Sequence, residues 1–106
     1  MKFNSQICTT REQSEALLKL GLKKETADMV WTHAYYGTWV VTESQNPFYE
    51  DRESIPAWSL HRLMCLCFNS GATHVELFED DDAYEILIYK IEMRIKKGYF
   101  NKEYLV

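Results

Sequence analysis

The sequence predicts a single α+β domain over residues 1–106, with helices packed on a small, mainly antiparallel sheet of three strands. Three segments carry the caps, apolar spacing or glycine stops of helices. Two others are rich in the β-branched and aromatic residues that favour strands. Four glycines and two prolines are too few for a turn-rich all-β protein. We therefore expect the order α-β-β-α-β-α.

A capping box predicts where the first helix begins. Thr9 would be the N-cap, and Glu12, three positions later, would return a hydrogen bond to the backbone of the cap. Leucines follow at helical spacing as far as Gly21, the residue type that most often ends a helix. Leu22 would then supply the apolar contact that accompanies such an ending.

Two strands are predicted next, at residues 29–33 and 38–42. Both stretches are rich in Val, Trp and Thr, which fit a pleated sheet. Residues 35–37 would turn the chain into a hairpin, although they are not one of the strong two-residue turn sequences. Residues 44–54 are polar and predict a long loop, the kind of segment in which binding residues often lie.

A second helix is predicted to begin after Ser59, a favourable N-cap. Trp58 before the cap and Leu63 after it would form a hydrophobic staple. Apolar residues continue at helical spacing to Phe68, and residues 69–71 end the helix. Residues 72–78 then predict the third strand.

The last segment fits both a strand and a helix. From Tyr89 to Lys96, apolar and charged residues alternate as in a strand. Apolar residues also recur at helical spacing, at Tyr84, Leu87, Ile88, Ile91 and Ile95. We favour the helix because four acids precede the segment at 79–82, while lysines and Gly98 close it. In that helix a second apolar stripe, Ile86, Tyr89 and Met93, lies beside the first.

The order of these motifs resembles a set of small uncharacterised proteins of gut anaerobic bacteria, often carried on prophage or conjugative elements. The motifs are Thr-x-x-Glu-Gln-Ser before a Leu-rich helix, Thr-Ala-Asp-Met with a Trp close behind, Ile-Pro-Ala-Trp-Ser-Leu, and a closing Lys-Gly-Tyr. The resemblance implies a mixed α+β domain in a bacterial cytoplasm or a phage-infected cell. It supports a helical last segment, and it transfers no catalytic residue.

Composition limits the compartment and the partners. The net charge of −4 disfavours attraction to a nucleic-acid backbone as a whole. The first residues lack the apolar region of a signal peptide, and no apolar run is long enough to cross a bilayer. Three cysteines have no spacing typical of a disulfide framework. We expect a cytoplasmic protein without a membrane partner.

No pattern in the sequence identifies a reaction, and we assign no catalytic, cofactor-binding or metal-binding residue. His61 and Cys65 share a helix face near Cys67, but two thiols two positions apart point away from a common metal. Cys8 lies just before the first helix and is the better nucleophile candidate, although an inert thiol is favoured. The acids at 79–82 lack the spacing of a calcium loop and suit a helix start.

Two surfaces of the last helix remain as candidates. Ile86, Tyr89 and Met93 would either complete the core or face a partner, which makes them the candidate interface. A basic cluster is the candidate nucleic-acid contact: Lys90, Arg94, Lys96 and Lys97. We expect a non-catalytic, self-associating protein-interaction module, whose partner is itself or another protein. The alternative is a nucleic-acid-binding accessory factor.

Overall fold

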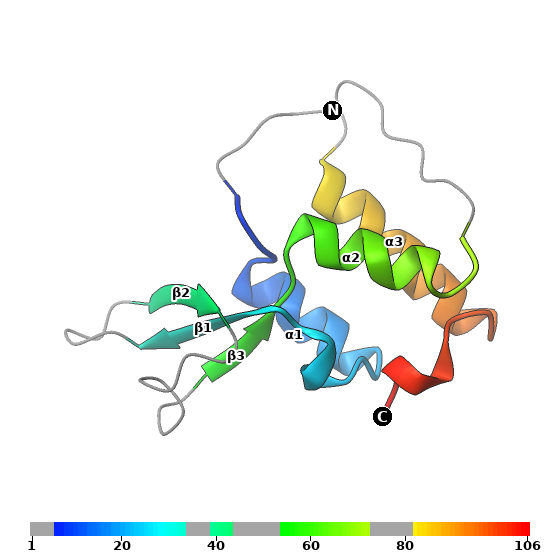
Figure 1. The fold of residues 1–106 in the computed structure, drawn as a ribbon, viewed down its shortest axis with the longest axis horizontal. Helices are drawn as coiled ribbons and strands as arrows, with labels where there is room; N and C mark the ends of the chain where they lie inside the picture. The colour runs from blue at the N-terminus through cyan, green and yellow to red at the C-terminus, as the bar shows by residue number, and fades with distance from the viewer. Residues whose placement is uncertain (1–5, 34–38, 44–53, 73–81) are drawn as a thin grey trace.

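The structure, a computed structural model, describes residues 6–33, 39–43, 54–72 and 82–106. In the described residues the elements are α1 Arg11–Lys19, η1 Lys24–Thr26, β1 Met29–His33, β2 Trp39–Glu43, β3 Ser54–Ala57, α2 Leu60–Phe68, α3 Ala83–Lys96 and η3 Lys102–Tyr104. The strands lie at one end of the molecule, α2 and α3 lie side by side at the other, and α1 contacts both groups (Figure 1). The predicted α+β class is confirmed.

In the described residues the sheet has three antiparallel strands in the order β2-β1-β3. The predicted number of strands in the sheet and their antiparallel direction are confirmed. Its third strand is Ser54–Ala57, so the described elements follow the order α-β-β-β-α-α and not α-β-β-α-β-α. Pro56 lies opposite Val30 on this edge strand, where a residue without an N–H is tolerated. The strand predicted at 72–78 falls, from residue 73 onwards, outside the described residues, as do the turn at 35–37 and most of the 44–54 loop.

Helix α1 has the predicted kind of capping box, one residue later than expected. Thr10 is the N-cap: its hydroxyl accepts the Gln13 N–H at 3.1 Å, and the Gln13 side chain accepts the Thr10 N–H at 2.9 Å. Thr9 is fully buried and serves another element, because its hydroxyl accepts the backbone N–H of Trp58 at 3.0 Å. The assignment of Thr9 and Glu12 to the box was therefore wrong.

Each of the three α-helices in the described part of the chain ends at a glycine of positive φ, as the sequence indicated. At α1 the Gly21 N–H donates to Leu18 O at 3.0 Å and the Leu22 N–H donates to Leu17 O at 3.3 Å, the two bonds of a Schellman ending. The same pair of bonds closes α2 at Gly71 and α3 at Gly98. These endings give the helices fixed lengths and turn the chain sharply after each one.

The last segment is helical from Ala83 to Lys96, which confirms the choice of helix over strand. Asp82 caps it by accepting the N–H groups of Tyr84 and Glu85. One side of α3 enters the core with Leu87 and Ile91, both fully buried. The other acids of the predicted cap, residues 79–81, lie outside the described residues.

Trp58 is the largest fully buried side chain in the described part of the chain. It follows β3 and precedes α2, and no part of it reaches solvent. Its indole N–H donates to the Thr26 hydroxyl at 2.9 Å, and its backbone exchanges hydrogen bonds with Thr9. Leu63 is also fully buried in the same cluster, as the predicted hydrophobic staple requires. The side chain and backbone of this one residue thus join the N-terminal segment, η1, the sheet and α2.

Candidate functional site

The outer side of α3 carries the candidate interface. Tyr89 is 61% exposed, and Ile86 and Met93 on either side of it are partly buried. With about 3.6 residues per turn, these three positions lie on the side of the helix opposite Leu87 and Ile91, not directly beside them. The second stripe therefore lies outside the buried cluster and gives α3 an apolar strip on the surface of the chain.

Charged residues of opposite sign flank this strip. Glu85 and Glu92 lie along one edge, and Lys90 and Lys97 lie along the other, as the helical period dictates. Glu85 and Lys97 are exposed, while Lys90 and Glu92 are partly buried. An apolar strip with one acidic and one basic edge is the arrangement in which a second helix is recognised by both packing and charge.

The four basic residues predicted to contact nucleic acid do not form one open patch. Arg94 is directed at the end of α2, where its Nη2 donates to the carbonyl oxygen of Ser70 at 2.6 Å. A Cβ at Gly71 would lie 3.2 Å from the same nitrogen, so the guanidinium packs closely there. Lys96 forms an ion pair with Glu92 at 2.8 Å. Lys90 and Lys97 remain on the basic edge of the strip.

Burial makes two of the three thiols poor nucleophiles. Cys8 is 2% exposed and Cys67 is fully buried. Loss of solvent raises the pKa of each thiol to about 11, and the carboxylate of Asp28 adds to the rise at Cys8. The pKa of Cys8 is thus raised, whereas a nucleophile would need it lowered. Both thiols are protonated at neutral pH and therefore lack the reactive thiolate.

The third thiol lies next to a histidine on the exposed part of α2. The distance from Cys65 Sγ to His61 Nε2 is 3.5 Å, as expected for positions one helical turn apart. Cys67, the other member of the predicted cluster, is buried on the core side of the helix. Within the described ranges, no group of three or more His, Cys, Asp or Glu side chains is placed to hold a metal ion.

We expect the thiols to react in a fixed order. In the native protein at pH 8, a disulfide reagent such as dithiobis-nitrobenzoate should modify Cys65 first. Cys8 and Cys67 should follow only as fast as the fold opens, because they are buried and protonated. Peptide mapping after a short exposure measures this order, and in denaturant all three should react together. Rapid modification of Cys8 in the native state would contradict it.

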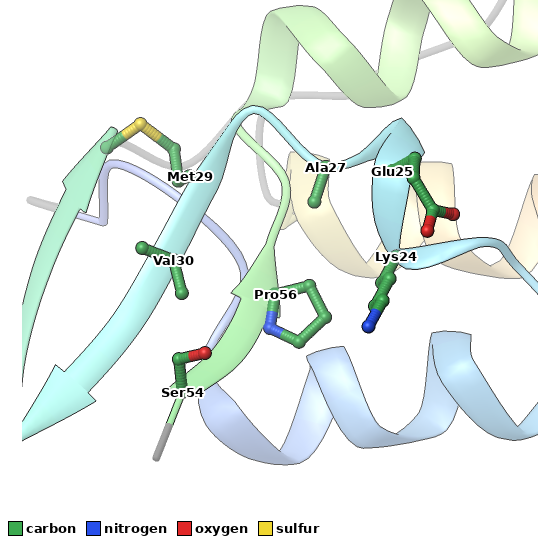
Figure 2. A pocket seen from close by; sticks show the side chains of 7 residues that line it. All are labelled: Lys24, Glu25, Ala27, Met29, Val30, Ser54 and Pro56. Carbon is green, nitrogen blue, oxygen red and sulfur yellow. The ribbon is translucent and has the colours of Figure 1, made fainter. Parts of the chain in front are cut away.

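A shallow hollow of about 420 Å³ lies between η1 and the sheet (Figure 2). Its lining comes from three segments: Lys24, Glu25, Ala27, Met29, Val30, Ser54 and Pro56. In Figure 2 the charged ends of Lys24 and Glu25 point in different directions, so they form no acid-base pair. The sequence assigned none of these residues to a binding or catalytic site, because nothing in their spacing marks them as one site.

Comparison of this chain with family models, with curated proteins and with solved structures found no match. The resemblance to small proteins of gut anaerobes therefore stays a prediction. No helix in the described part of the chain is long and apolar enough to cross a membrane.

Proposed function

We propose that this protein is a non-catalytic protein-interaction module that binds its partner through the outer side of α3. The observation that carries the proposal is the exposure of Tyr89, 61%, between two further apolar side chains of the same strip. Tyrosine and methionine are enriched at protein interfaces. Covering an apolar side chain of this size contributes about 1.5–3 kcal/mol relative to leaving it in water.

The position of the strip supports an external partner over the alternative of core burial. Leu87 and Ile91 already fill the side of α3 that faces the core, and they are fully buried. Ile86, Tyr89 and Met93 are on the opposite side and, among the described residues, belong neither to the buried cluster nor to the apolar residues packed against it. The protonated state of Cys8 and Cys67 is a further reason to prefer binding over thiol catalysis.

Nucleic-acid binding through the basic residues of α3 is the alternative proposal, and it has less support. Arg94 is engaged by the carbonyl of Ser70 and Lys96 by Glu92. The net charge of −4 would also repel a phosphate backbone over most of the surface.

Met93→Glu tests the proposed function. We expect this variant to weaken association, with itself or with a partner, by about tenfold or more, because a carboxylate would enter an apolar contact. The free energy of unfolding should stay within about 1 kcal/mol of the wild-type value, since Met93 is outside the core cluster. Analytical ultracentrifugation and urea unfolding measure the two quantities.

Ile91→Glu is the matched control on the other side of the same helix. It places the same charge at a fully buried position and should unfold the domain. If Met93→Glu unfolds the protein as Ile91→Glu does, the strip belongs to the core and the proposal is wrong. Unchanged association of both Met93→Glu and Tyr89→Glu would also reject it.

A further inference from the structure

We infer that the occupant of this strip is a second copy of the chain, packed so that two α3 helices run parallel along a two-fold axis. The inference rests on the proposed function, since it names the partner for the same surface. It comes from the order of charged and apolar residues along α3 and its C-cap Lys97: an acid, an apolar residue and a lysine each recur seven positions later, whereas Tyr89 is followed by Lys96.

The repeat assigns every position of the outer side of α3. Apolar Ile86 and Met93 occupy the first core position, a, of each repeat, and Tyr89 occupies the second, d. The acids Glu85 and Glu92 are at the edge position g, and the lysines Lys90 and Lys97 are at the opposite edge position e. In a parallel pair, each g residue meets the e residue five positions further along the other helix.

Both possible edge pairs have opposite charges. Glu85 would meet Lys90 of the second copy, and Glu92 would meet Lys97 of the second copy. The two-fold axis repeats each pair, so the interface has complementary charge along both edges. An antiparallel pair would instead place Glu85 against Glu92 and Lys90 against Lys97, which are like charges. The charge order therefore selects the parallel arrangement.

The contacts that the described residues make with Glu85 and Glu92 can coexist with this interface. Glu92 is held by Lys96 in an exposed pair one helical turn apart, a weak interaction that a second partner can replace. Glu85 accepts a hydrogen bond from the side chain of Gln13 and, as a carboxylate, can accept another. Lys96 is at the last d position, where its charge disfavours core packing and ends the apolar strip at the end of α3.

A cross-link tests the orientation. In a protein carrying Cys65→Ser, we expect Lys96→Cys to form a disulfide-linked dimer on mild oxidation, because d positions face each other only in the parallel pair. The remaining thiols, Cys8 and Cys67, are buried. Lys19→Cys, an exposed position on α1, is the matched control and should stay monomeric in denaturing electrophoresis. Equal cross-linking at both sites, or none at Lys96→Cys, overturns the parallel arrangement.

Charge reversal tests the edge pairs. The double variants Glu85→Lys/Glu92→Lys and Lys90→Glu/Lys97→Glu should each dimerise at least about tenfold more weakly, while an equimolar mixture should form a mixed dimer. Lys19→Glu/Lys102→Glu produces the same change in net charge as the second variant at exposed sites off the strip and should dimerise like the wild type. Failure of the mixture to associate overturns the edge pairing.

The oligomeric state separates this inference from the proposed function. A dimer that Met93→Glu dissociates supports both. A wild-type chain that stays monomeric at the highest concentration that analytical ultracentrifugation can measure overturns the second copy as occupant. The proposed function then stands only if Met93→Glu abolishes binding to another protein. A dimer that Met93→Glu leaves intact uses a different surface and rejects both.

Discussion

Trp58→Ala is expected to lower the free energy of unfolding by about 3–5 kcal/mol, the usual cost of truncating a fully buried aromatic side chain. Trp58 has no exposed surface, and its ring is surrounded by the cluster that α1, α2 and α3 share. Most of the loss comes from the cavity. The Thr26 hydroxyl loses the indole donor but still donates to Lys23 O at 2.6 Å, so it is not left unpaired.

Two companion variants separate the cavity from the hydrogen bond. Trp58→Phe keeps much of the ring and loses the indole N–H, so it should cost about 1–2 kcal/mol. Trp31→Phe removes a comparable donor, the Nε1–H that bonds Thr9 O at 2.9 Å, from a partly buried ring and should cost less. Urea unfolding followed by circular dichroism, with an unchanged m-value, measures all three. A loss below about 1 kcal/mol for Trp58→Ala would show that this ring is not the core anchor.

Features set by neighbouring residues were predictable from the sequence. Ser59 caps α2, Trp58 and Leu63 are both buried as the staple requires, and the helix ending at Gly21 has both expected hydrogen bonds. Each depends on residues within a few positions of one another, so the physics that selects them is visible in a short window. The helical form of α3 was also predictable, because the acids before it and the lysines and Gly98 after it favour a helix more clearly than its interior does.

Features set by distant partners were not predictable in this way. Thr9 and Thr10 are equivalent as caps in the local sequence. The hydrogen bonds that hold Thr9 in the core include partners as distant as Trp58, 49 positions away, and Trp31. Strand β3 is four residues long and contains Pro56, so its sequence has only a weak preference for a strand. It forms a strand because it pairs with β1. The sequence identified the second apolar stripe of α3 but wrongly placed it beside the first. The contact of Arg94 with Ser70 was not predictable, because it depends on the packing of α2 on α3.

The stability of the fold is expected to fall between pH 9 and about 11 because two thiols ionise later in the folded chain than in the unfolded chain. The pKa of Cys8 and of Cys67 rises from 9.0 to about 11 on folding, mainly through burial. Below pH 9 both thiols stay protonated in the folded and in the unfolded chain, so they do not change the free energy of unfolding with pH. Above pH 9 the unfolded state binds fewer protons than the folded state, so the free energy of unfolding decreases as pH rises.

The expected loss from each thiol is about 2–3 kcal/mol once the pH exceeds both values. Urea unfolding at half-unit steps from pH 8 to 11 measures it, and the double variant Cys8→Ala/Cys67→Ala is the control. At pH 8 the variant should have a lower free energy of unfolding than the wild type, since both cysteine side chains fill the core. Its free energy of unfolding should fall less steeply as the pH rises. Burial also raises the pKa of Tyr84, so a smaller slope of the same sign should remain in the variant. An identical slope in both proteins would mean that neither thiol is desolvated, and the argument against a thiolate nucleophile at Cys8 would then fail with it.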